Sequence, residues 1–127
     1  MAGNLTNYLE NKLIDHFLGT TSYTMPADVY VALFTVAPSD AGGGTEVTGG
    51  SYARKIATFS AASSGATSND SNIDFTGMPA ATTVAIGIFD ALTTGNMLLY
   101  GTLTTNKTTD AGDTLRIATG DLDISID

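Results

Sequence analysis

The amino-acid sequence predicts a mainly β protein, an antiparallel β-sandwich or barrel of about seven to eight strands with one N-terminal helix. Short apolar runs recur at intervals of roughly ten to twenty residues and are separated by turn residues. The polar positions are filled by threonine and other short neutral residues, which suit a pleated, half-exposed surface. A helical period occurs in one segment, at the start of the chain.

The N-terminal helix is expected over residues 5–18. Apolar side chains recur every fourth residue in this segment, at Leu5, Leu9, Leu13 and Phe17. Asn4 is the expected N-cap, and Gly19 is expected just after the C-terminus, where a left-handed residue commonly ends a helix. We expect the apolar stripe of this helix to pack across the sandwich. The helix is therefore the rival, not the preferred, surface for contacts with other proteins.

Seven further segments are predicted to be strands. They are residues 29–36, 52–59, 73–75, 82–89, 97–104, 114–118 and 121–127. The first of these is apolar throughout and suits a strand buried on both faces, whereas the last alternates, with Leu122, Ile124 and Ile126 expected to face the core. Residues 90–96 are the expected hairpin turn between the fourth and fifth strands, and residues 60–72 lack large apolar side chains and are expected to form a loop. Residues 1–127 are expected to form a single domain.

The composition excludes several classes of partner and chemistry. The formal charge is -8, and binding to nucleic acid or to an anionic membrane requires clustered Lys and Arg. No apolar run approaches the roughly 18 residues that a membrane span needs. There is no cysteine, which removes disulfides, thiolate catalysis and Cys-ligated zinc. We therefore expect no nucleic-acid partner, no membrane partner and no cofactor.

The glycine run Gly42 to Gly44 shares its consecutive glycines with phosphate-binding loops. Such a loop requires a Lys and a Ser or Thr after the glycines, and then a helix whose N–H groups point at the phosphate. Here Thr45 and Glu46 follow, with an acid in place of the lysine and no helical pattern. A structural loop is therefore the expected interpretation.

No residue pattern predicts catalysis. His16, the single histidine, lies within the expected helix beside Phe17, and a half-exposed histidine near a helix C-terminus is favoured there by the dipole. The nucleophile-elbow pattern G-x-S-x-G does not occur. The carboxylates of the last strand and of the 110–113 turn could supply oxygen ligands to calcium, but a solvated acidic face is the expected interpretation. We expect no enzymatic activity and no metal site.

Several blocks of the sequence together resemble a family of small structural proteins of tailed-phage particles, described as tail-fibre or virion proteins. These blocks are NLTNYLENKLIDHFLG, VYVALFT with PSD, GGGTEVTGGSYAR, GIFDA with TGNMLLYG, and GDTLRIATGDLDISID. They cover most of the chain. The resemblance implies a β-rich, non-enzymatic component of the virion that is present in many copies.

Two positions in the particle agree with this resemblance. We expect capsid decoration, as a cement protein on the particle surface, because a compact acidic domain without elongated repeats suits a solvent-facing coat. The alternative is a tail or tail-fibre component, which could bind a host receptor or glycan. Both imply assembly in the host cytoplasm, a homo-oligomer, and other virion proteins such as the major capsid protein as partners.

Two long loops are the expected assembly surfaces, because long loops without secondary structure often become ordered against a partner. These loops span residues 38–50 and 60–72. The candidate contact residues are Asp40, Gly43, Thr45, Glu46, Ser64, Thr67 and Asn69.

Overall fold

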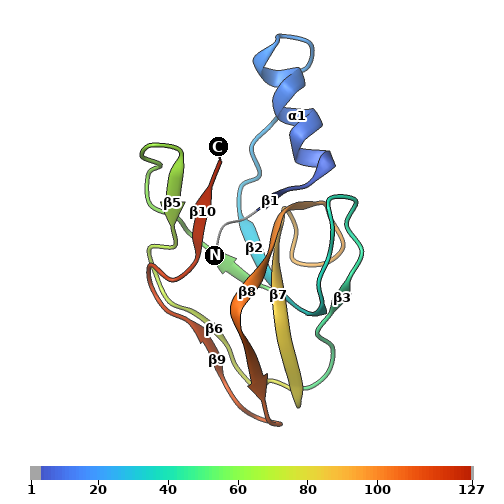
Figure 1. Ribbon diagram of the computed structural model, residues 1–127, viewed down its shortest axis with the longest axis vertical. Coiled ribbons are helices and arrows are strands. Elements are labelled where there is room, and N and C mark those ends of the chain that lie inside the picture. Colours follow the sequence, from blue (N-terminus) through green and yellow to red (C-terminus); the bar gives the residue numbers. More distant parts are fainter. Residues whose placement is uncertain (1–3, 127) are drawn as a thin grey trace.

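The computed structural model describes residues 4–126, which form an open, sandwich-like stack of antiparallel sheets with one N-terminal helix (Figure 1). This confirms the predicted mainly β class, and within the described residues the sheets do not close into a barrel. Residues 4–126 contain ten strands, more than the seven or eight expected. Very short strands at the sheet edges account for much of the difference.

The larger layer is a six-stranded sheet. Its order is β1 (Asn4–Leu5), β8 (Met97–Thr109), β7 (Ala81–Phe89), β2 (Val29–Val36) and β3 (Thr45–Glu46), and β4 (Lys55–Ala57) also pairs with β2. Strands β7 and β8 form the predicted hairpin, and β2 lies beside β7 in the centre. The short strands β3 and β4 pair with successive parts of β2, from Thr45 opposite Val36 to Ala57 opposite Val29.

The second layer consists of two strand pairs. One pairs β6 (Ile73–Phe75) with β9 (Leu115–Ile117), and the other pairs β5 (Ala66–Ser68) with β10 (Asp123–Ser125). Segment 60–72, expected to be a loop, therefore contributes a strand. The C-terminal segment supplies the backbone partner for β5, and sequence patterns do not reveal a partner so distant along the chain. Figure 1 shows β5 and β10 side by side, away from the six-stranded sheet.

The main hydrophobic core lies between the two layers. Its fully buried members include Val31, Leu33, Phe75, Met78, Ile86 and Leu122. Leu122 and the half-buried Ile124 face this core, as the alternation of the last strand predicts. Ile126 does not, because 55% of its surface is exposed where the chain runs past the end of β10. Asp127 lies outside the described residues.

A smaller apolar cluster lies on the opposite face of the six-stranded sheet. It contains Ala32, Phe34, Ala85 and Phe89, with Val84 and Met97 packed against it. The rings of Phe34 and Phe89 stack with centroids 6.3 Å apart. Gly87 leaves room for both rings, since an added Cβ would lie 3.0 Å from a ring carbon of Phe34. The central strands β2 and β7 are buried on both faces, as the unbroken apolar run of β2 predicts.

Helix α1 spans Asn7–Phe17, within the range expected. The N-cap is Thr6, not Asn4. Asn4 belongs to β1, where it pairs with Tyr100 of β8, so the helix starts after this strand. At the other end the residue after the C-cap is Gly19, as predicted, with φ +77°. The Thr20 N–H donates to the Asp15 carbonyl at 2.9 Å, which completes a Schellman motif.

The expectation that α1 packs along its length across the sandwich is wrong. Within α1 only Leu9 is buried, while Ile14 and Phe17 are exposed by 55% and 73%. Figure 1 shows why: the helix starts beside β8 and then projects away from both layers. No helix in the described part of the chain is long and apolar enough to cross a membrane.

Candidate functional site: the groove at the glycine loop

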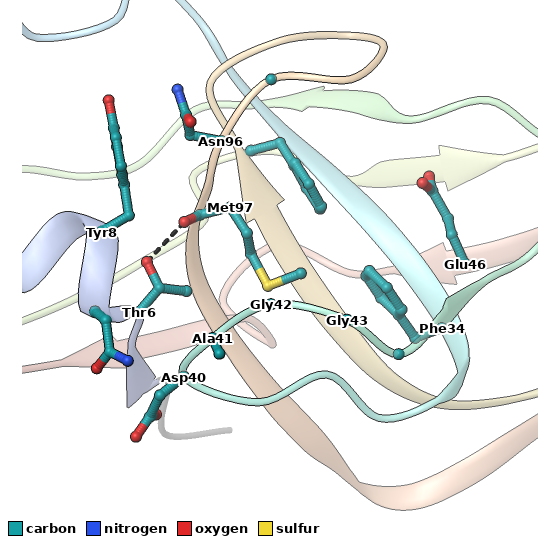
Figure 2. Close-up of a pocket in the computed structure, with 14 residues that line it drawn as sticks. Thr6, Tyr8, Phe34, Asp40, Ala41, Gly42, Gly43, Glu46, Asn96 and Met97 are labelled. Carbon is teal, nitrogen blue, oxygen red and sulfur yellow. Dashed lines mark hydrogen bonds between the residues drawn. The ribbon is translucent and has the colours of Figure 1, made fainter.

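Several predicted contact residues line an open groove of about 500 Å³ (Figure 2). One wall is the start of α1, from Thr6 to Tyr8. The other wall is the loop of residues 40–44, which we call the glycine loop. The smaller apolar cluster lies beneath them, and its residues Phe34, Phe89 and Met97 line the bottom of the groove. The groove therefore has an apolar floor and polar walls.

Thr6 anchors the helix wall of the groove. Its Oγ1 donates to the Met97 carbonyl at 2.7 Å and accepts from the Leu9 N–H at 3.3 Å, so one hydroxyl caps α1 and attaches it to β8 (Figure 2). The Asn7 N–H, one of the N–H groups left unpaired by the helix, donates to the Asp40 carbonyl at 3.0 Å. The helix start is thereby fastened to both the sheet and the glycine loop.

Asp40 joins the loop to the sheet through its side chain as well. The Tyr100 hydroxyl donates to the Asp40 carboxylate. This hydrogen bond raises the pKa of Tyr100, because loss of the proton would break it and place two negative charges together. Asp40 therefore holds the loop through both its backbone and its carboxylate.

Glu46 stands at the opposite end of the groove in a buried polar network. Its carboxylate accepts from Arg54 Nε at 3.0 Å, from Arg54 Nη2 at 2.9 Å and from the Tyr52 hydroxyl at 2.9 Å. The same Tyr52 oxygen accepts from the Leu33 N–H at 2.9 Å. Burial, together with the charge and hydrogen bond of Glu46, raises the pKa of Tyr52 far above its ordinary value. Tyr52 is thus a structural donor and acceptor.

Arg54 extends this network to the 90–96 turn. Its Nη1 donates to the carbonyls of Ala91 at 3.0 Å and Thr94 at 2.8 Å, and its guanidinium lies 3.7 Å from the centroid of the Phe89 ring. At the other side of that turn, Asn96 is held by the Asp90 carboxylate. The turn that closes the β7–β8 hairpin is therefore fixed relative to the glycine loop.

The glycines of the loop differ in what they require. Gly44 has φ +75°, and a Cβ there would lie 2.6 Å from the Val36 carbonyl oxygen, so both conformation and space demand glycine. Gly43 has a similar φ of +77° but nothing within 4 Å of an added Cβ. Gly43 therefore faces open space, where an approaching partner could contact the backbone directly.

Both carboxylates of the groove are engaged by neighbouring side chains. The Asp40 carboxylate accepts a hydrogen bond from Tyr100, and the Glu46 carboxylate accepts hydrogen bonds from Arg54 and Tyr52. His16 lies elsewhere: its Nδ1 accepts from the Tyr23 N–H at 3.1 Å and so ties the end of α1 to the following loop. Within residues 4–126, no three His, Asp or Glu side chains converge as metal ligands.

The structure separates the predicted contact residues into two places. Asp40, Gly43 and Glu46 line the groove, and Thr45 follows in β3 with an exposed side chain. Ser64, Thr67 and Asn69 belong to the β5 region, which pairs with β10 and shares no lining residue with the groove. The two segments therefore do not form one surface.

The residues of the second segment differ in accessibility. Ser64 is exposed in a turn with φ +52°, and Thr67 donates its hydroxyl to the Ser60 carbonyl at 2.6 Å. Asn69 is 1% exposed and lies inside the domain. Its amide donates to two carbonyls and its oxygen accepts two N–H groups. The side chain of Asn69 is thus occupied within the chain.

Sequence reasoning missed the helix wall of the groove. The sequence predicts Thr6 and Tyr8 within a helix and Met97 within a strand. The three residues meet at the groove because β1 pairs with β8. One signal was present: Thr6 stands three residues before Leu9, the spacing at which a threonine N-cap accepts a helix N–H.

Comparison with protein families identifies the chain. The family model for podophage GP4 fiber I protein gp80 matches residues 4–125. The chain belongs to this family. No curated protein matches it. The chain is accordingly a structural component of the phage virion, which confirms the resemblance noted in its sequence blocks.

The family match covers both walls of the groove and every contact residue that the sequence predicts. The family description names a fibre, which agrees better with the tail-fibre alternative than with capsid decoration. The residues that the family model matches are therefore nearly the same as those that the structure describes.

Proposed function

We propose that this chain is a non-enzymatic subunit of a fibre on the phage tail. The observation that carries the proposal is the family match over residues 4–125, which spans the strands of both layers and the helix. Capsid decoration, the function favoured by the composition, lacks a comparable observation. Assembly in the host cytoplasm is part of the same proposal.

The bonding of the polar side chains supports a structural role. A general acid or base must be free to exchange a proton with a substrate. In the groove the carboxylate of Glu46 is engaged by three donors and that of Asp40 by Tyr100, while Arg54 is used to hold Glu46 and the 90–96 turn. These groups make the loop rigid, which suits a surface that must fit a neighbouring protein.

The glycine loop is the first contact surface that we propose between this protein and other virion proteins. Asp40 and Glu46 fix both ends of the loop, whereas Gly43 and Thr45 between them are exposed. A pre-ordered loop loses little conformational entropy on binding. Ser64 and Thr67 supply a second, separate surface, from which the buried Asn69 side chain is excluded.

Labelling of intact particles tests the position of the protein. Antibodies against the purified chain, coupled to gold, should mark the tail or its fibres in electron micrographs. Quantitative mass spectrometry of the same particles should find a low copy number, in simple ratio to a known tail protein. Gold distributed over the capsid, with hundreds of copies per particle, would establish decoration instead and refute the proposal.

A further inference from the structure

The C-terminal end of α1 presents apolar side chains to solvent. Ile14, Phe17 and Leu18 are exposed by 55%, 73% and 78%, and we call these three residues the apolar tip. Met25, on the segment that returns from the helix to β2, is exposed by 81%. These four account for half of the eight large hydrophobic side chains that are exposed in residues 4–126. Such concentration marks an interaction surface, since single exposed apolar residues are otherwise scattered.

The spacing of the apolar tip is that of a helix–helix contact. Residues at i, i+3 and i+4 lie on one face of a helix, and Ile14, Phe17 and Leu18 have this spacing. Leu9 and the start of α1 are fastened to β8, so the face that remains free is at the far end. An eleven-residue helix is marginal by itself, and the large apolar side chains at its C-terminal end are exposed.

The apolar tip is nevertheless ordered by backbone bonds. The N–H groups of Thr20 and Thr21 donate to the Asp15 carbonyl at 2.9 and 3.3 Å, and the Tyr23 N–H donates to His16. The loop after the helix therefore folds back against the last turn. A surface held in this way is prepared for docking, because little further ordering is required when a partner arrives.

The charge distribution indicates which partner fits. Residues 12–25 contain one Lys and one Asp, so the whole formal charge of -8 belongs to the rest of the chain. Two copies of this protein repel each other through this acidic remainder, whose carboxylates lie mostly in the loops and turns between the strands. That repulsion is least when the copies meet at their net-neutral ends, and Figure 1 shows the end of α1 projecting away from the strand layers.

We propose that the apolar tip docks against the apolar tip of a second copy of this chain. The contact is isologous: the same three side chains of each copy pack together about a symmetry axis, and the acidic remainder of each copy points away from it. A cationic partner, by contrast, would be drawn to the carboxylates of the connecting loops and not to the net-neutral end of α1. This inference rests on the proposed function, because it specifies where copies of a fibre subunit meet.

Disulfide trapping tests the contact directly, since the chain has no cysteine of its own. Three variants, Ile14→Cys, Phe17→Cys and Leu18→Cys, are oxidised mildly at several concentrations, with Leu92→Cys as the control. Leu92 is 50% exposed and lies in the 90–96 turn. At least one tip variant should form covalent dimers where Leu92→Cys stays monomeric. If all four variants cross-link equally, the inference is overturned.

Sedimentation of the cysteine-free chain supplies an independent measurement. The natural protein should self-associate, and Phe17→Lys should raise the dissociation constant at least about tenfold, as expected for a central interface aromatic. Leu92→Lys adds the same charge and should leave the constant unchanged. Circular dichroism confirms that each variant is folded. A natural chain that stays monomeric to about 1 mM, the effective concentration between tethered domains, contradicts the proposal.

The two proposals can fail separately. Gold labelling of the tail, combined with no trapping through the apolar tip, leaves the fibre function standing and removes the tip contact. Trapping through the apolar tip, combined with gold labelling of the capsid, leaves the tip contact standing and removes the fibre function. Trapping of the tip to a different virion protein in particles assembled with Leu18→Cys would replace the second copy as the occupant and overturn the inference.

Discussion

Arg54 lies over the ring of Phe89, with its guanidinium carbon 3.7 Å from the ring centroid. The other side of the same network is the carboxylate of Glu46, which accepts two hydrogen bonds from Arg54. The Arg54 side chain is only 9% exposed. One cation therefore joins β3, the β7–β8 turn and the apolar floor of the groove.

Replacement of Arg54 should destabilise the protein. Arg54→Met keeps an apolar stem against Phe89 but leaves the Glu46 carboxylate without its cation, and we expect a loss of about 2 to 4 kcal/mol in the free energy of unfolding, less than for a fully buried pair. The double variant Arg54→Met with Glu46→Gln should recover part of this loss. Urea unfolding followed by circular dichroism measures both, and equal stabilities of the single and double variants would argue against the pair.

Asn69 should be far less tolerant of change than its exposed neighbour Ser64. Asn69→Ala leaves the carbonyls and N–H groups that its amide satisfies without partners, which should cost about 2 to 4 kcal/mol. Ser64→Gly alters an exposed residue with φ +52°, a conformation glycine adopts freely, and should change stability by less than about 0.5 kcal/mol. Thermal unfolding of both variants provides the comparison.

The two ends of α1 should respond differently to truncation of a large side chain. Leu9→Ala removes a side chain that is 8% exposed and should cost about 2 to 4 kcal/mol. Phe17→Ala removes a side chain that is 73% exposed and should cost less than about 0.5 kcal/mol in the monomer. Denaturant unfolding at low protein concentration measures both, so that association does not contribute. Similar losses for the two variants would show that the helix end is packed.

Alanine substitutions at Gly43 and Gly44 should separate the cost of a left-handed backbone conformation from the cost of a steric overlap at the added Cβ. Gly43→Ala places an L-residue at φ +77° in open space and should cost about 1 to 2 kcal/mol. Gly44→Ala adds an overlap with the Val36 carbonyl oxygen, so we expect a larger cost of about 3 kcal/mol or more. The order of the two melting temperatures is the decisive result.

The Asp74–Arg116 pair should make stability depend on acid pH. Arg116 Nε lies 2.7 Å from Asp74 Oδ1, and this hydrogen bond lowers the pKa of Asp74 below its ordinary value of 3.8. Because the folded pKa is the lower one, the contribution of the pair is present above about pH 4 and is lost as the pH falls through the folded pKa. In a carboxyl NMR titration, Arg116→Gln should raise the pKa of Asp74, whereas Lys107→Gln should leave it unchanged.

Local patterns sufficed for the long elements. The unbroken apolar run of Val29–Val36 predicted β2 with its observed bounds, and the helical period gave α1 to within two residues at each end. Asn4 was misplaced because its backbone groups pair with β8, a partner that lies more than ninety residues away. Strand β5 was missed for a similar reason, since its polar residues become a strand through pairing with β10.

By itself, the sequence determined what depends on neighbours along the chain: the mainly β class, the helix with its Gly19 end, the central strands, and the resemblance to phage particle proteins. The tertiary structure alone decided that the glycine loop faces the helix start across a groove, that Asn69 is interior, and that Phe17 is exposed. The physical reason is that apolar periodicity records which side chains can be buried. Whether they are buried depends on where the sheet ends, and α1 extends beyond that end.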